Sequence, residues 1–309
     1  MTDQSIFQAL AEAARTGKPV TLGVITRVNG SSPQKTGAKA VFHADSRITG
    51  TLGGGCLEAE LQRRALEALR RGQASQFDLL LDHDFGWDDG LVCGGKVEGL
   101  ILPNAQAAGE GFWRSLARRE STRVWGIDRN FCAQEGHAGA SQDWLYQETV
   151  RPPCALWIAG AGHVAQAVTP LALQLDFNVT VMDDRPALVS HRLFPAETHL
   201  VADVWETLLK QPTPAGPLFG LIVTRGHRHD ALVLREWIHG PFAFLGMIGS
   251  RRKARTIQEH FIAEKIASPE QLARVICPVG LPIGSRTVSE IAVSIVAQLI
   301  QERTRITLA

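Results

Sequence analysis

The sequence lacks the features of membrane-spanning and nucleic-acid-binding proteins. None of its 309 residues belongs to a run approaching the ~18 consecutive apolar residues that a transmembrane helix needs. Its 32 Lys and Arg are balanced by 31 Asp and Glu, for a net charge of +1, whereas nucleic-acid binding relies on a clustered excess of cations. We therefore expect neither a membrane nor a nucleic acid as a partner.

Cysteine is scarce and widely spaced. The five cysteines include no CxxC pair, which argues against a zinc ribbon. The N-terminal segment is predicted to form an amphipathic helix. We do not interpret it as a signal peptide, because its charge order and hydrophobicity are wrong for one. These features predict a cytoplasmic protein with reduced thiols. A P-loop and a Ser/His/Asp triad with a nucleophile elbow are also absent, and no catalytic residue stands out.

The chain is long enough for two domains. Residues 1–127 mix helix-like and strand-like segments, which predicts a smaller α+β domain. Residues 128–153 lack periodicity and end in a Pro-Pro pair, so we interpret them as a linker. Residues 154–309 alternate strands and helices, as in a doubly wound parallel sheet. We expect an α/β protein whose C-terminal domain is Rossmann-like.

The segment 155–185 has the order of a dinucleotide-binding unit. An apolar strand precedes Gly160 and Gly162, a helix begins at His163, and a second strand ends at Asp183. Gly160 permits a tight turn, Gly162 lets an anion approach the helix start, and Asp183 suits hydrogen bonds from ribose hydroxyls. The pattern indicates the fold strongly and a nicotinamide cofactor weakly, because this fold binds many ligands. The alternative is that the glycines only shape the turn.

Two further loops follow predicted strands, where ligands of such sheets bind. One contains His227, which could bind a ligand or act as an acid or base. The other opens a helix with Ser250 as the N-cap and with Arg251 and Lys253 in the first turn. Cations at a helix start interact unfavourably with the helix dipole. An anion bound at the same end would offset this unfavourable interaction. The alternative is a solvated basic helix start.

In the first domain, three glycines at 53–55 precede Cys56 and a helix predicted over 58–71. Such a run carries a backbone entropy cost that makes sense where the chain approaches a ligand or adopts positive φ. A helix start favours the thiolate of Cys56, and thiolates suit thiophilic metal centres. Cys93 has a similar setting after a polar loop predicted over 83–90. The alternative is two small buried residues in tight turns.

Seven segments together resemble the XdhC/CoxI family of xanthine dehydrogenase accessory proteins: GSSPQKTGAK, GTLGGGCLEAE, CGGKVEGLILP, GAGHVAQAV, VTVMDDRP, GMIGSRRKA and PVGLPIGSRTVSEIAVSIVAQLI. The resemblance covers nearly the whole chain, and the motifs follow the family order. It implies a molybdenum cofactor chaperone rather than an enzyme. Such a protein binds molybdopterin cofactor, aids its sulfuration with a NifS-like cysteine desulfurase, and delivers it to xanthine dehydrogenase or a related molybdenum hydroxylase.

We also form a hypothesis about where such a cofactor would lie, since a glycine turn at a helix start can hold its phosphate and a reactive cysteine suits its metal end. Its phosphate would be held at 160–163 or 250–253, and its metal end would face Cys56 as a contact for molybdenum across the cleft between the domains. Two alternatives remain open. One is an NAD(P)-dependent oxidoreductase, which rests on the glycine fingerprint alone. The other is a scaffold that bridges a desulfurase and a hydroxylase without binding cofactor, and a homodimer is among the expected assemblies.

Overall fold

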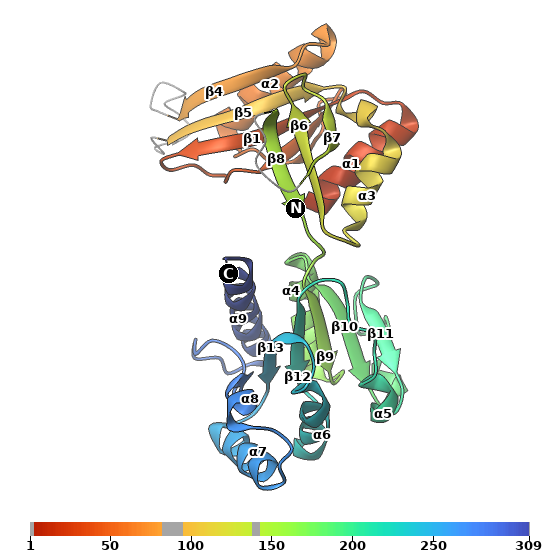
Figure 1. Ribbon diagram of the computed structural model, residues 1–309, viewed down its shortest axis with the longest axis vertical. Coiled ribbons are helices and arrows are strands. Elements are labelled where there is room, and N and C mark those ends of the chain that lie inside the picture. Colours follow the sequence, from red (N-terminus) through yellow and green to blue (C-terminus); the bar gives the residue numbers. More distant parts are fainter. Residues whose placement is uncertain (1–2, 82–94, 138–142, 309) are drawn as a thin grey trace. The chain divides into compact units, whose positions relative to one another are not determined.

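The computed structural model describes residues 3–81, 95–137 and 143–308. The chain divides into two compact units, Met1–Arg151 and Pro152–Ala309 (Figure 1). Within the described residues, the first unit carries antiparallel sheets and the second a parallel sheet. The expected mixed α/β class is therefore confirmed. No helix in the described part of the chain is long and apolar enough to cross a membrane.

The N-terminal unit is built on a five-stranded antiparallel sheet, with a three-stranded sheet beside it. Its elements are α1 (Asp3–Thr16), β1 (Val20–Asn29), β2 (Lys39–His43), β3 (Ile48–Gly50), α2 (Gly55–Arg71), β4 (Ser75–Leu81), β5 (Gly95–Pro103), η2 (Ala105–Ala108), α3 (Glu110–Arg118), β6 (Arg123–Asp128), β7 (Ala133–Glu135) and β8 (Trp144–Val150). The larger sheet has the order β3-β2-β1-β5-β4, and the smaller one the order β7-β6-β8.

The central strand β1 is covered on both faces. Leu22 and Val24 belong to a core shared with α1, α3 and the smaller sheet. Thr21 points to the other face, where its hydroxyl donates a 3.0 Å hydrogen bond to the Ala65 carbonyl of α2. Successive side chains of a strand alternate between its faces, so a strand covered on both sides is apolar nearly throughout.

The residues predicted as a linker, 128–153, include strands β7 and β8, and this corrects the domain boundaries expected from the sequence. Both strands pair antiparallel with β6. Glu148 of β8 also binds the buried Lys39 of β2. Strand β7 is too short, and β8 too polar, for a periodic pattern to appear in the sequence. The first unit consequently runs to Arg151.

The C-terminal unit is a parallel sheet with helices on both faces (Figure 1). Its elements are β9 (Ala155–Ala159), α4 (His163–Gln174), β10 (Asn178–Asp183), η3 (Pro186–Leu188), β11 (His199–Ala202), α5 (Trp205–Leu208), β12 (Leu218–Ile222), α6 (His227–Trp237), β13 (Phe242–Met247), α7 (Arg251–Ala263), α8 (Pro269–Ala273), β14 (Val275–Ile276) and α9 (Val288–Leu308). The described strands lie in the order β11-β10-β9-β12-β13-β14.

Alternation along β9 divides this unit into two cores. Leu156 and Ile158 pack in one core with α4 and α9, whereas Trp157 packs in the other with helices α5 to α8. The strand order reverses between β9 and β12, and ligands of doubly wound sheets bind beyond the carboxyl ends of the strands at such a reversal. The Rossmann-like architecture predicted from the sequence is confirmed, although α8 and the two-residue strand β14 were not predicted.

Candidate functional site

The two glycines of the turn between β9 and α4 have different roles. Gly160 has φ of +113°, and a Cβ atom there would lie 2.7 Å from the Val223 carbonyl carbon and 2.9 Å from the Thr224 Cα. Packing against the chain after β12 therefore requires Gly160. Gly162 has φ of −74°, and a Cβ atom there would meet nothing within 4 Å. Only Gly162 leaves open space beside the start of α4.

Asp183 supports this glycine turn from the end of β10. Its side chain is 1% exposed, and its Oδ2 accepts a 2.7 Å hydrogen bond from the Ala161 amide. Arg185 donates to the same carboxylate from its backbone amide, Nε and Nη2. Burial alone would raise the pKa of Asp183, but the hydrogen bonds from Arg185 and Ala161 hold it below its usual value.

The structure therefore corrects the role expected for Asp183. Both carboxylate oxygens are already bonded within the protein, so Asp183 orients the turn and does not present an open acceptor to a ribose. The neighbouring Asp184 lies at the same strand end, and its carboxylate accepts a 2.8 Å hydrogen bond from Arg225 Nη2. The same Nη2 atom is 3.0 Å from His229 Nε2. The hydrogen bond between Asp184 and Arg225 therefore connects the chain after β10 to the chain after β12.

A second buried carboxylate lies on the other side of the strand reversal. Asp230, in the first turn of α6, has a side chain that is 1% exposed. Its Oδ1 accepts hydrogen bonds from the Thr224 hydroxyl at 2.6 Å and the Thr224 amide at 3.1 Å. Its Oδ2 is paired with the Lys253 ammonium, which also donates to the Ile248 carbonyl at 3.0 Å. Asp230 thus joins the loops that precede α6 and α7.

This pair changes the interpretation of the basic start of α7. Ser250 is the N-cap, as predicted, because its Oγ accepts from the Lys253 amide at 3.2 Å. The Lys253 ammonium, expected to face a phosphate, is instead engaged with Asp230 inside the unit. Cys277 is half-buried near Lys253, and burial raises the pKa of its thiol despite that cation. Arg251 remains exposed at the helix start.

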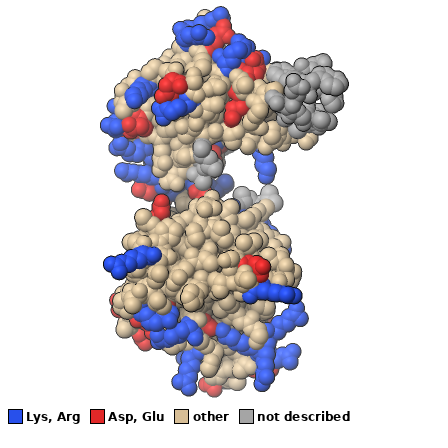
Figure 2. Space-filling view, turned by 180° about the vertical axis from the view of Figure 1, so that it is seen from behind, with Lys and Arg blue, Asp and Glu red and all other residues tan. Residues whose placement is uncertain are grey.

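The predicted histidines lie at the same edge of the sheet. His163 and His227 are the first residues of α4 and α6, and both are exposed. In the space-filling view, Lys and Arg side chains gather over the lower part of the C-terminal unit, where α6 and α7 lie (Figure 2). The carboxyl edge of the sheet therefore combines helix starts with cationic side chains, an arrangement suited to an anion.

In the N-terminal unit, Cys56 follows a glycine run that packs against the chain after β1. The glycines at 53–55 all have positive φ, and Cys56 is the second residue of α2, half-buried. A Cβ atom at Gly53 would lie 2.9 Å from Pro33 Cγ, and one at Gly95 would lie 2.7 Å from the Ser31 carbonyl carbon. Gly53 and Gly95 thus both lie beside the chain at residues 31–33.

Two predictions for this region fall outside the described residues, namely Cys93 and the loop over 83–90. The part of the chain that the structure describes contains no group of three or more His, Cys, Asp or Glu residues arranged to hold a metal ion. The roles of Asp184, Asp230 and Arg185 were not predicted. Their positions at strand ends and in a first helical turn are visible in the sequence, but their partners are not.

Family models match both units. The model of the XdhC and CoxI family matches residues 13–84, and the model of the XdhC Rossmann domain matches residues 156–299. The chain is 26% identical over 298 residues to the uncharacterized protein YqeB of Escherichia coli K12. That alignment covers 96% of this chain but 46% of YqeB, so the chain spans about half the length of that relative.

Two other relatives and one solved structure match over most of their length. A probable xanthine dehydrogenase subunit of Bacillus subtilis is 25% identical, with 92% of this chain and 93% of that protein covered. The molybdenum cofactor insertion chaperone PaoD of E. coli K12 is 24% identical, with 97% and 88% covered. A crystal structure described as a xanthine dehydrogenase from Bacillus halodurans superposes with a TM-score of 0.83 at 25% identity, covering 99% of this chain and 96% of that one. With one model matching each unit, the chain belongs to the XdhC and CoxI family.

Proposed function

We propose that this protein binds the molybdenum cofactor and serves the maturation of xanthine dehydrogenase or a related molybdenum hydroxylase. A role in xanthine dehydrogenase maturation is supported by the family and by relatives named as a cofactor insertion chaperone and as part of a xanthine dehydrogenase. We further propose that the protein binds the cofactor directly and aids its sulfuration with a NifS-like cysteine desulfurase. In this proposal it then transfers the cofactor to the client, and it forms a homodimer.

The observation that carries the proposal is the open turn at Gly162 beside cationic side chains. The α4 start offers backbone N–H groups, and the helix dipole favours a phosphate there. Arg185 and Arg225 are partly exposed at neighbouring strand ends, and Arg251 is exposed at the start of α7. These donors fit the phosphate of molybdopterin. When bound, the cofactor supplies molybdenum and its dithiolene sulfurs to the client.

Substituting Gly162 by Val is expected to weaken cofactor binding by about tenfold or more, because the side chain would occupy the space beside the helix start. The unbound protein should keep its fold, since nothing lies within 4 Å of a Cβ atom there. Equilibrium dialysis with molybdopterin cofactor measures the affinity. Gly111→Val, at an equally open position near the start of α3 in the other unit, is the control. Unchanged affinity in folded Gly162→Val protein would remove the turn from the site.

Cys56 is the proposed thiol contact for the cofactor's metal end. Replacing Cys56 by Ser nearly keeps the size of the side chain but removes the sulfur, so we expect loaded protein to lose most of its retained molybdenum. Mass spectrometry after removal of excess cofactor measures retention, and activation of a cofactor-free hydroxylase measures transfer. Cys132→Ser, at an exposed cysteine of the same unit, is the control. If Cys56→Ser behaves as the wild type in both assays, the cysteine is only structural.

A further inference from the structure

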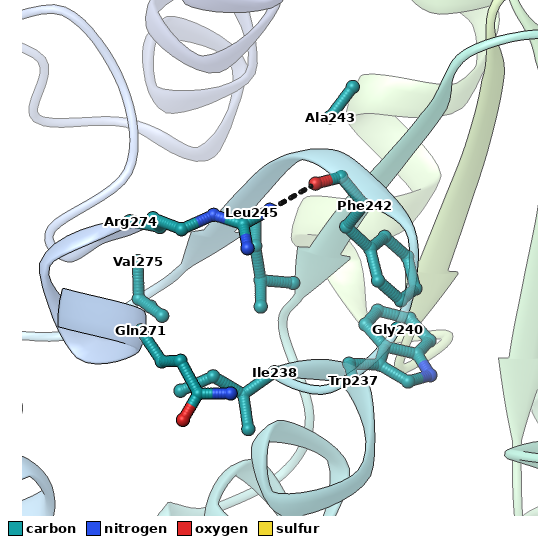
Figure 3. Close-up of a pocket in the computed structure, with 9 residues that line it drawn as sticks. All are labelled: Trp237, Ile238, Gly240, Phe242, Ala243, Leu245, Gln271, Arg274 and Val275. Atoms are coloured by element: carbon teal, nitrogen blue, oxygen red, sulfur yellow. Dashed lines mark hydrogen bonds between the residues drawn. The ribbon is translucent and has the colours of Figure 1, made fainter. Parts of the chain in front are cut away.

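A pocket of about 210 Å³ opens at the amino ends of β13 and β14, opposite to the strand ends that carry the proposed cofactor site. Figure 3 shows the side chains that surround it. They are Trp237, Ile238, Gly240, Phe242, Ala243, Leu245, Gln271, Arg274 and Val275. We propose that this pocket, here called the anchor pocket, holds a large apolar side chain of a partner protein that lies next to a carboxylate.

The apolar wall of the anchor pocket belongs to the core. Trp237, Phe242 and Leu245 are buried and pack in the cluster that lies beneath helices α5 to α8. The Trp237 and Phe242 rings are in contact, with centroids 4.9 Å apart. Core side chains keep fixed rotamers, so the shape of the pocket exists before a ligand enters. A preformed pocket avoids part of the entropy cost of binding.

The polar rim of the pocket carries an unneutralised cation. Arg274 Nη2 donates a 2.9 Å hydrogen bond to the Phe242 carbonyl, which holds the guanidinium beside the pocket (Figure 3). No carboxylate in the described part of the chain lies within salt-bridge distance of Arg274, and its other N–H groups remain available. Gln271 adds an amide to the same rim. A carboxylate next to the apolar group would complement this cation.

The size of the pocket favours a protein partner over a free small molecule. Small-molecule sites usually enclose roughly 300–1,000 Å³, and this pocket is smaller. Protein interfaces commonly bury one large side chain in a pocket of a single residue's size, surrounded by polar contacts. Because the anchor pocket and the cofactor site lie at opposite edges of the sheet, a partner bound here would leave the cofactor site accessible. The inference therefore stands independently of the proposed function.

The probes for this proposal are N-acetyl-L-phenylalanine, which has a free carboxylate, and its neutral amide. Titration of the isotope-labelled full chain, followed by amide NMR, should show saturable shifts in residues 242–245 and 271–275. The acid should bind about tenfold more tightly than the amide, because a charged carboxylate accepts from the Arg274 guanidinium more strongly than a neutral amide oxygen does. In the Arg274→Gln variant this difference should disappear. Arg235→Gln, at an exposed arginine of α6 outside the pocket, should keep it.

A second variant tests the pocket without touching Arg274. Ala243→Trp places a large side chain at an exposed lining position and should reduce the binding of both probes at least tenfold. Shifts that map elsewhere, equal affinities for acid and amide, or undiminished binding to Ala243→Trp would each overturn the proposal. Cofactor affinity measured on the same variants should stay at the wild-type value, so a failure here is distinguishable from a failure of the cofactor proposal.

Discussion

Replacing Lys39 by Met should destabilise the N-terminal unit by about 2 kcal/mol, because it removes the buried cation that pairs with the half-buried Glu148 carboxylate. The Lys39 side chain is 1% exposed, and its ammonium lies 2.8 Å from Glu148 Oε2 and 2.7 Å from the Gly37 carbonyl oxygen. Removing one partner of such a pair costs more than the pair contributes, since the remaining Glu148 carboxylate is only 19% exposed and is only partly solvated.

The remaining contacts of Glu148 show what depends on Lys39. The Trp125 indole donates to Glu148 Oε1 at 2.7 Å, and the Tyr146 hydroxyl donates to Oε2 at 2.5 Å. Burial, together with the Glu148 carboxylate, raises the pKa of Tyr146 far above its ordinary range, so the phenol stays a donor. The network joins β2 of the larger sheet to β6 and β8 of the smaller one. Loss of Lys39 should therefore loosen both sheets.

Lys96→Met is the matched control for Lys39→Met. Lys96 pairs with Asp78 at 2.6 Å in the same sheet, but both side chains are exposed, and such surface pairs contribute about 0–1 kcal/mol. A two-unit protein need not unfold in one step, so hydrogen exchange of peptides from β2 and β8 in urea should be followed unit by unit. Equal exchange in both variants would show that the Lys39 network contributes no more than a surface pair.

Replacing Gly160 by Ala should destabilise the C-terminal unit by about 3–5 kcal/mol. The added Cβ atom would clash with backbone atoms of Val223 and Thr224, and a non-glycine residue is strained at φ of +113°. Backbone strain of this kind costs about 1–3 kcal/mol and overpacking costs a similar amount. The backbone on the other side of the contact directly follows β12. Its Val223 amide donates a 2.9 Å hydrogen bond to the Ala159 carbonyl, so it cannot move away without disturbing the pairing of β12 with β9.

Gly162→Ala, two residues further on, is the control for Gly160→Ala. Its φ of −74° suits any residue and its Cβ atom would meet open space, so stability should change by less than about 1 kcal/mol. Urea denaturation, followed by hydrogen exchange of peptides from β9 and β12, measures both variants. Equal stabilities would contradict the distinction between a glycine required for packing and a glycine that leaves room for a ligand.

Much of the C-terminal unit was predictable because its signals are local. Alternation along strands and helical spacing arise within a few residues, so the sequence alone determined the Rossmann-like unit, the glycine turn before α4 and the Ser250 cap of α7. The glycines at 53–55 likewise indicated positive φ, and Cys56 was expected near the start of a helix over 58–71, which begins at Gly55. Each of these features depends on a residue and its immediate neighbours.

Only the tertiary structure decided which side chains meet. Asp183 is bonded to the turn that precedes it by 22 residues, and Lys253 is bonded to Asp230 across 23 residues. Whether a carboxylate faces a ligand or a neighbouring loop depends on how strands align in the sheet, which no local pattern contains. The same reason explains β8, whose place in the first unit depends on Glu148 meeting Lys39 of a distant strand. Buried charges are stable only when paired, and the pairing exists only once the chain has folded.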